Sequence, residues 1–178
     1  VIQHEYEHSA SQKNWAIPQA KYEWILLLDA DEIVTDKLKI EIQKVLSKEV
    51  KESGFWIYRE NYFLGKKINY SGWQYDKVIR LFKRDECRYE NKRVHAEIID
   101  NGRMGFLKNK LVHKTYKSFD HYLLKIKRYA EWQSDDLDQN KKKIMFYHFV
   151  FKPPFRFIKH YIIQRGFLDG KVGFIIAA

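Results

Sequence analysis

Acidic residues at the end of an apolar run have the clearest potential for chemistry in this sequence. The run WILLL over residues 24–28 is followed at once by Asp29, Asp31 and Glu32. In an extended chain, carboxylates two residues apart face the same side, and ligands of α/β sheets bind beyond the carboxyl ends of strands. The pattern therefore predicts a site for a hard divalent cation, with room for water and substrate phosphates. The alternative is that Asp31 and Glu32 only precede a helix and favour its N-terminal dipole.

The hydrophobic pattern predicts the elements that would position these acids. Residues 22–29 indicate a buried strand, and Thr35 is placed to cap a helix that ends near residue 47. Four further runs are predicted strands: 55–59, 77–82, 94–99 and 110–113. Glycines mark a loop or hairpin at 61–73 and a turn at Asn101-Gly102. Two more stretches carry helical signals: 11–20, limited by Pro18, and 118–137, packing through Tyr122, Ile126 and Tyr129.

The composition excludes several classes of protein. Of the 178 residues, 45% are hydrophobic and 16% aromatic, which argues against general disorder. The single cysteine, Cys87, excludes an internal disulfide framework and a cysteine-rich zinc site. No signal-peptide pattern is present, and no apolar run approaches the length of a transmembrane helix. An excess of 33 Lys and Arg over 23 Asp and Glu gives a net charge of +10, which predicts attraction to anions.

The character of the chain changes near its end. Residues 1–140 read as a globular domain, and residues 141–178 as a basic, aromatic, helical appendage interrupted by Pro153-Pro154. Three apolar residues would share one side of this appendage: Phe155, Ile158 and Ile162. Such a segment can lie in a membrane interface, where anionic lipid attracts its basic groups. The alternative is a helix that packs on another domain or subunit. Both ends of the sequence read as cut, so we expect a fragment of a longer protein.

Several motifs in a fixed order resemble the family 2 glycosyltransferases of the GT-A fold. The first is N-x-A-x-x-x-A-x-x-E-W-I-L-x-L-D-A-D-E, over residues 14–32. The others follow in the order Tyr62-Phe-Leu-Gly-Lys, Gly72-Trp, Arg80-Leu-Phe-Lys-Arg, Val94-His-Ala-Glu, Leu111-Val-His-x-x-Tyr and Gly166-Phe-Leu-Asp-Gly-x-x-Gly-Phe. Within the family, the chain looks like the bacterial branch that builds lipopolysaccharide core and other surface glycans. The family normally begins with a βαβ segment that grips the nucleotide, which we expect upstream of Val1.

The resemblance implies a fold, an activity and a location. The fold would be α/β, a partial Rossmann-like GT-A sheet with flanking helices. The activity would be an inverting transfer of a sugar from a nucleotide-diphosphate sugar, expected to be a UDP-sugar, to a lipid-linked or lipopolysaccharide core acceptor. Asp29 and Asp31 would take the donor and Mg²⁺ or Mn²⁺, with Asp31 the more direct ligand and Glu32 a helper. The protein would lie on the cytoplasmic face of the bacterial inner membrane, attracted to its anionic surface.

Such a transfer needs a base for the attacking hydroxyl. Glu97 is the first candidate, although many relatives carry the acid one residue earlier, where this chain has Ala96. In a strand this slip puts Glu97 on the face of His95. Asp76 is therefore the second candidate for the base. The alternative for Glu97 is that it is only an exposed carboxylate on a strand. The candidates for phosphate contacts are Arg80, Arg84, His95 and His113, and those for the acceptor are Trp73 and Arg93. Each of these could instead be structural.

Two readings from other classes compete with the transferase. A nucleic-acid-binding module would use the positive charge and the aromatic residues. Its basic residues are spread along the chain, however, and the D-A-D-E run would repel a phosphate backbone without a metal, so we expect no nucleic-acid partner. A catalytically inert fragment is the second competitor. The sequence does not specify the sugar, the acceptor or the linkage.

Overall fold

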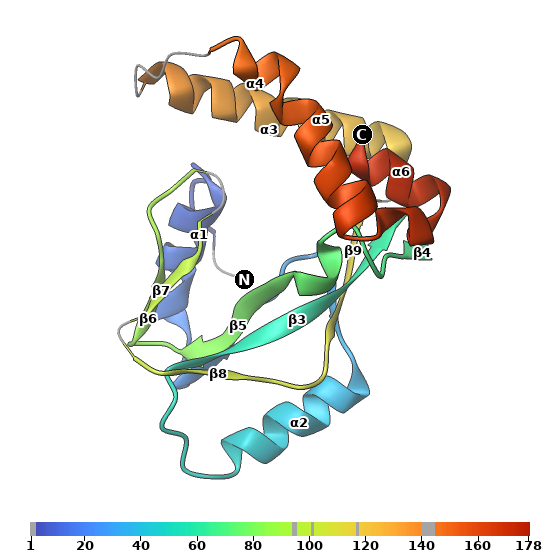
Figure 1. Cartoon of the computed structure of the whole chain (residues 1–178). Coiled ribbons are helices and arrows are strands. Elements are labelled where there is room, and N and C mark those ends of the chain that lie inside the picture. Colours follow the sequence, from blue (N-terminus) through green and yellow to red (C-terminus); the bar gives the residue numbers. More distant parts are fainter. Residues whose placement is uncertain (1–2, 94–95, 101, 117, 140–144) are drawn as a thin grey trace. The chain divides into compact units, whose positions relative to one another are not determined.

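The computed structural model groups most of the chain into two compact units (Figure 1). It describes five ranges of residues: 3–93, 96–100, 102–116, 118–139 and 145–178. One unit consists of Val1–Arg59 and Lys77–Leu111, and the other of Glu60–Asp76 and Val112–Ala178. The predicted domain boundary near residue 140 lies outside the described residues, as do Asn101 of the predicted turn and the first two residues of the predicted strand 94–99.

The first unit contains a mixed sheet. Strand β5 (Lys77–Lys83) lies between β1 (Trp24–Leu26) and β3 (Gly54–Phe63) and is antiparallel to both. β8 (Met104–Phe106) pairs in parallel with the start of β3, which continues into the second unit. β6 (Cys87–Tyr89) and β7 (Ile98–Asp100) form a separate antiparallel pair. Strands mixed in direction and flanked by helices confirm the predicted α/β class and are consistent with part of a Rossmann-like fold.

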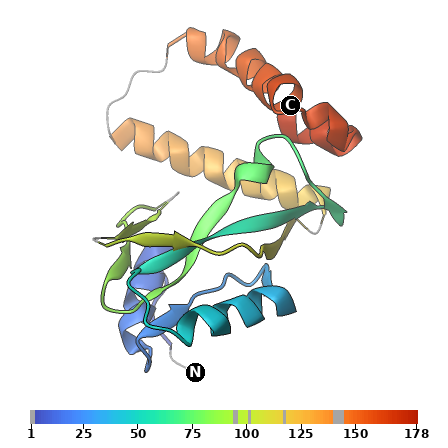
Figure 2. The same cartoon turned by 60° about the horizontal axis from the view of Figure 1, so that its bottom comes forward.

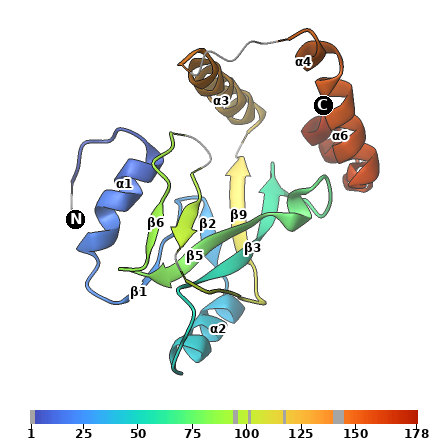
Figure 3. The same ribbon diagram turned by 60° about the vertical axis from the view of Figure 1, so that its left-hand side comes forward.

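Two helices lie beside this sheet, α1 (Ser9–Ala16) and α2 (Asp36–Leu46) (Figure 3). Apolar side chains of the sheet are buried in two core clusters that include residues of these helices. Thr35 caps α2 as predicted, because its Oγ1 accepts a hydrogen bond from Leu38 N at 3.2 Å. One core cluster gathers around α2: Leu38, Ile42, Phe55, Ile57, Leu81, Leu107 and Leu111. A second gathers around α1 and the residue that follows it: Ala10, Ile17, Ile79, Phe82, Cys87 and Tyr89. β5 therefore contributes side chains to two cores.

Strand β1 differs from the predicted buried strand over residues 22–29. It spans only three residues, and Leu26 and Leu28 are 38% and 40% exposed. Among the described strands, β1 has β5 as its one neighbour, so it is an edge strand. The prediction of burial is therefore wrong for the end of this run, where the chain leaves the sheet and approaches Asp29.

The second unit begins with the end of β3 and a hairpin to β4 (Lys66–Lys67). Leu64 and Gly65 at its tip have φ of 49° and 79°, as a tight two-residue hairpin turn requires. Strand β9 (Leu111–Tyr116) leads toward α3 (Phe119–Gln139). On α3, Tyr122 packs against Phe63 and Tyr116 with ring centroids 4.9 and 5.0 Å apart. Two residues predicted to continue this packing face are instead exposed, Ile126 and Tyr129.

Short helices follow α3 and run back in the opposite direction (Figure 2). They are α4 (Tyr147–Val150), α5 (Lys152–Phe157), a π-helical turn (Ile158–Ile163) and α6 (Lys171–Ala177). Pro153-Pro154 lie in the first turn of α5, so they begin a helix and do not interrupt one. The first turn tolerates proline because its N–H groups have no partner within the helix. Among the described residues, no helix combines the length and apolar character that crossing a membrane requires.

Asp169 fastens this C-terminal segment to the residues after β4. Its side chain is buried, and its carboxylate accepts hydrogen bonds from Asn69 N at 3.1 Å and Tyr70 N at 2.9 Å. Lys66 Nζ donates to the Asp169 carbonyl oxygen at 2.6 Å. Gly166 permits a close approach, since a Cβ there would lie 2.5 Å from Ser71 Oγ. The end of the chain and residues 66–71 therefore form one packed region.

Candidate active site

The acids predicted to share one face of an extended chain lie instead in a tight turn. Glu32 N donates to the Asp29 carbonyl oxygen at 3.0 Å, and Asp29 N donates to Glu32 Oε2 at 3.0 Å. Asp at the first position and an i to i+3 hydrogen bond are typical of a β-turn. Glu32 then begins β2 (Glu32–Val34), and its side chain is fully buried. The extended geometry predicted for Asp29 and Asp31 is therefore wrong, but both acids lie close together in one half-buried turn.

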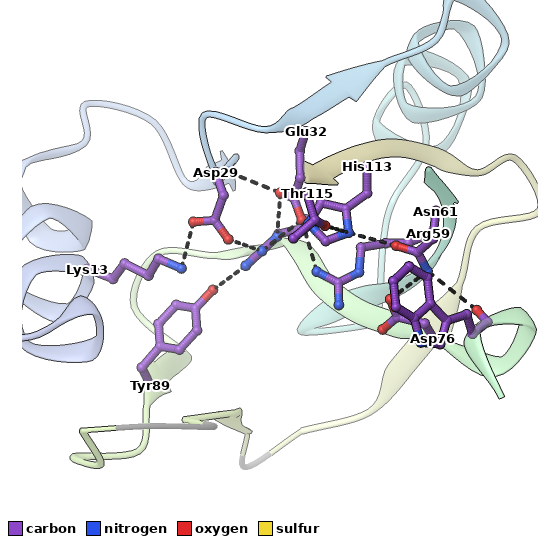
Figure 4. Close-up of polar contacts among 11 residues, drawn as sticks. Lys13, Asp29, Glu32, Arg59, Asn61, Asp76, Tyr89, His113 and Thr115 are labelled. Carbon is purple, nitrogen blue, oxygen red and sulfur yellow. Dashed lines mark hydrogen bonds and ion pairs between the residues drawn. The ribbon is translucent and has the colours of Figure 1, made fainter. Parts of the chain in front are cut away.

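Arg80 fixes this turn from the middle of β5. Its Nε and Nη2 each donate to one oxygen of Glu32 at 2.8 Å, and Nη2 also donates to Asp29 Oδ2 (Figure 4). Its Nη1 donates to the Tyr89 hydroxyl at 3.0 Å. Arg80 is only 5% exposed, so its charge is buried and needs these partners. In the structure the guanidinium is directed at carboxylates, and its contact with donor phosphate stays a prediction.

Lys13 holds the second oxygen of Asp29. Its Nζ lies 2.8 Å from Asp29 Oδ1 and 5.1 Å from the centroid of the Tyr89 ring (Figure 4). The neighbouring Asn14 bonds the Tyr89 backbone twice, donating to its carbonyl and accepting from its N–H, both at 2.8 Å. Lys13, Asp29, Arg80 and Tyr89 thus form a closed ring of contacts. Neither Lys13 nor Tyr89 could be predicted as part of this site, because each lies on an element distant in sequence from Asp29.

The charges in this cluster of contacts determine the protonation states of Asp29 and Arg80. Burial acts to raise the pKa of Asp29, but the Arg80 guanidinium and the Lys13 ammonium lower it, and the net pKa lies below its ordinary value of 3.8. The negative charge of Asp31 acts in the opposite sense, which reflects how near the two acids are. Burial would lower the pKa of Arg80, yet its hydrogen bond to Glu32 and the nearby charges raise it. Asp29 is therefore ionised and Arg80 protonated at neutral pH.

The acids fit a divalent cation only in a limited way. Both oxygens of Glu32 are bound to Arg80, and Arg59 lies 3.5 Å from one of them, so Glu32 is committed to protein partners. Among the described residues, no group of three or more His, Cys, Asp or Glu side chains could hold a metal by itself. Asp29 and Asp31 remain as two nearby carboxylates. Mg²⁺ is often bound this way, by one or two carboxylates completed by water and substrate phosphates.

A separate polar cluster lies in the second unit. Asn61 Nδ2 donates to Asp76 Oδ2 at 2.8 Å, and Asn61 Oδ1 lies 2.7 Å from His113 Nδ1 (Figure 4). Because an amide oxygen can only accept, Nδ1 is the donor in this contact when it carries a proton. Thr115 Oγ1 lies 2.9 Å from His113 Nε2. Two residues singled out from the sequence, Asp76 and His113, are thus joined through the buried Asn61, which the sequence analysis missed.

The other predicted site residues differ in their exposure and contacts. Glu97 is exposed, and its backbone exchanges hydrogen bonds with Glu90. Arg84 pairs with its neighbour Asp85 at 2.7 Å. Trp73 packs edge-on against Phe63, and its carbonyl oxygen accepts a hydrogen bond from Asn61 Nδ2 at 3.4 Å. Arg93 is exposed, and His95 lies outside the described residues.

Comparison with known proteins relates the chain to glycosyltransferases, as its motifs predicted. It is 27% identical over 170 residues to the lipopolysaccharide core biosynthesis glycosyltransferase LpsC of Rhizobium meliloti (strain 1021), covering 94% of this chain and 63% of that protein. It is 24% identical over 180 residues to the uncharacterized glycosyltransferase RT0209 of Rickettsia typhi (strain ATCC VR-144 / Wilmington), covering 92% of this chain and 60% of that protein. No family model matches. The chain therefore spans somewhat less than two thirds of the length of these relatives.

Proposed function

We propose that this chain is the catalytic part of an inverting glycosyltransferase that moves a sugar from a UDP-sugar to a lipopolysaccharide core or other lipid-linked acceptor. The observation that carries the proposal is the turn of Asp29 and Asp31, held by the buried Arg80 and placed directly after an apolar strand. The similarity to LpsC, a glycosyltransferase of lipopolysaccharide core biosynthesis, supports the kind of acceptor. Ionised carboxylates at a sheet edge suit the binding of a nucleotide diphosphate together with a cation.

The residues of the turn would have separate tasks. Asp31 and Asp29 would hold Mg²⁺ or Mn²⁺, which when bound neutralises the charge of a departing diphosphate. Glu32 would have no ligand role, because its buried carboxylate fixes Arg80. Arg80 in turn fixes Asp29, so the geometry of the acids would exist before the donor binds. Preorganised charge of this kind lowers the barrier because no rearrangement is needed during the reaction.

Two carboxylates are candidates for the general base that activates the acceptor hydroxyl, Asp76 and Glu97. Asp76 is held in place by Asn61, whereas Glu97 is exposed. We expect one of two substitutions, Asp76→Asn or Glu97→Gln, to lower kcat by at least about a hundredfold, which is the usual effect of removing a general base. The KM for the donor should change little. The measurement is Mn²⁺-dependent UDP release from a panel of UDP-sugars, in the presence of a lipopolysaccharide core acceptor.

Matched controls make this assay decisive. Glu86→Gln and Asp85→Asn replace exposed acids of the same unit as Glu97 and should leave kcat unchanged. If neither Asp76→Asn nor Glu97→Gln lowers kcat, both base candidates are wrong. If no UDP-sugar is turned over with any acceptor in Mn²⁺, the proposed transfer is wrong. If turnover is seen but EDTA leaves it unchanged, the proposed metal dependence is wrong.

The C-terminal segment supports a membrane-bound acceptor. Residues 145–178 contain one acid, the buried Asp169, against five basic residues, all exposed: Lys152, Arg156, Lys159, Arg165 and Lys171. Large apolar side chains are exposed in the same segment, among them Phe151, Phe155, Ile158, Ile162 and Ile163. Positive charge beside exposed apolar surface is typical of segments that lie in an anionic membrane interface. We propose that the protein binds the inner face of the bacterial inner membrane through this surface.

Vesicle binding tests this surface. The wild-type chain should co-sediment with vesicles of phosphatidylglycerol and much less with vesicles of phosphatidylcholine. Replacing Lys152, Arg156 and Lys159 together by Gln should weaken binding to the anionic vesicles by about a hundredfold, at roughly 1 kcal/mol for each charge. A triple Lys→Gln variant at Lys37, Lys39 and Lys44, on the helix α2, is the matched control. Equal binding by both triple variants would contradict the assignment.

A further inference from the structure

We infer that Lys13 is a phosphate-binding residue of the donor site, and that it is ion-paired with Asp29 until a cation and a diphosphate bind. The inference rests on the proposed function and adds to it a residue that neither the motifs nor the comparisons assign. Its ligand would be the diphosphate of a nucleotide sugar.

The two cations on Asp29 are held very differently. Arg80 contacts Oδ2 from a buried position, with further hydrogen bonds to Glu32 and Tyr89. Lys13 contacts Oδ1, and its other described contact is with the face of the Tyr89 ring. A guanidinium fixed by several charged partners cannot leave without exposing a buried charge. A lysine ammonium on a flexible four-carbon stem can move.

A divalent cation at Asp29 must therefore displace Lys13. Oδ2 is bound to Arg80, so Oδ1 is the oxygen that a cation can take, and Lys13 Nζ already lies 2.8 Å from it. Two positive groups cannot both contact one oxygen at bonding distance without strong repulsion. The released ammonium would lie beside the diphosphate, whose oxygens replace the lost carboxylate as acceptors. Charge-assisted hydrogen bonds to phosphate are strong enough to keep it there.

A second lysine of the same unit shows what a purely structural arrangement looks like. Lys83 has a side chain 18% exposed, against 19% for Lys13, and it lies over the Trp24 ring at 5.8 Å. Its acidic partner Glu86, at 3.1 Å, is about half exposed and lies outside the candidate site. The two lysines therefore match in burial, aromatic contact and ion pairing. They differ in the acid that they neutralise, which makes Lys83→Gln the control for Lys13→Gln.

The test measures binding and not turnover. Mn²⁺ binding is followed by the free-ion electron paramagnetic resonance signal, and UDP binding at saturating Mn²⁺ is followed by calorimetry. We expect Lys13→Gln to bind Mn²⁺ about threefold to tenfold more tightly than the wild type, because the competing charge is gone. The same variant should bind UDP about tenfold more weakly, because a charged phosphate contact is lost. Lys83→Gln should match the wild type in both titrations.

Each other result overturns the inference. A Lys13→Gln variant that binds Mn²⁺ more weakly and melts at a lower temperature would show that Lys13 only stabilises the turn. Unchanged affinities for Mn²⁺ and UDP would show that Lys13 has no part in the donor site. If the wild type itself binds no Mn²⁺, the proposed cation site fails, and the role of Lys13 fails with it. Binding by the wild type that Asp29→Asn abolishes and Lys13→Gln leaves unchanged would overturn the role of Lys13 alone.

Discussion

Replacing Asp31 by asparagine is expected to reduce metal-dependent sugar transfer by about a hundredfold to a thousandfold, the size seen when one preorganised charge-stabilising group is removed. Asparagine keeps the shape of the side chain and removes the negative charge that would bind the cation. Asp31 is half-buried in a turn whose hydrogen bonds come from Asp29 and Glu32, so the turn should persist. The measurement is UDP release at a series of Mn²⁺ concentrations, together with thermal unfolding.

The neighbouring acid Asp36 supplies the control for this experiment. It is exposed in the first turn of α2, five residues further along the chain, and Asp36→Asn makes the same chemical change outside the turn. Full activity in Asp36→Asn and a large loss in Asp31→Asn, with similar melting temperatures, would support the site. Equal turnover by Asp31→Asn and the wild type would remove Asp31 from the cation site.

Replacing Arg80 by methionine is expected to cause the largest loss of stability of any single change in the candidate site. Methionine keeps most of the volume but leaves the fully buried carboxylate of Glu32 without its bidentate partner. Breaking a buried ion pair from one side costs about 3–5 kcal/mol in the free energy of unfolding, because the remaining charge is uncompensated. Urea denaturation followed by circular dichroism measures this loss.

Two further variants decide whether the loss comes from the ion pair. Arg80→Met combined with Glu32→Gln removes both charges and should recover part of the stability lost in Arg80→Met alone. Arg84→Met removes an arginine whose described side-chain partners are the exposed Asp85 and the Ala20 carbonyl, and it should change the unfolding midpoint little. An Arg80→Met variant as stable as Arg84→Met would mean that the buried network does not hold the turn.

The sequence predicted those parts of the fold that depend on neighbouring residues. The helix after Thr35 needs only a capping hydroxyl and apolar residues at helical spacing, both of which can be read locally. The acids at the end of the apolar run were found for the same reason. Their conformation was not, because the turn depends on the burial of Glu32 against Arg80, 48 residues away in the sequence. Local patterns carry no information about such a pairing.

One signal in the sequence could have indicated the role of Arg80. It stands in the middle of a strand whose neighbours Ile79 and Leu81 are apolar and buried. A charged residue at a buried position is rare unless it is paired, so a nearby acid was required, and the acids after residue 28 were the natural candidates. No comparable signal exists for Lys13, which lies on a short helix among other polar residues.

The attachment of Asp169 has a practical consequence for dissecting the protein. A boundary drawn near residue 140 from composition would remove Asp169, leaving the amides of Asn69 and Tyr70 without their acceptor. The segment that carries the exposed cationic surface is thereby also a scaffold for the residues that lead to Trp73 and Asp76. Truncating the chain near residue 140 would therefore damage the part of the protein that the truncation was meant to isolate. Charge-neutralising substitutions are the safer means of separating lipid attachment from chemistry.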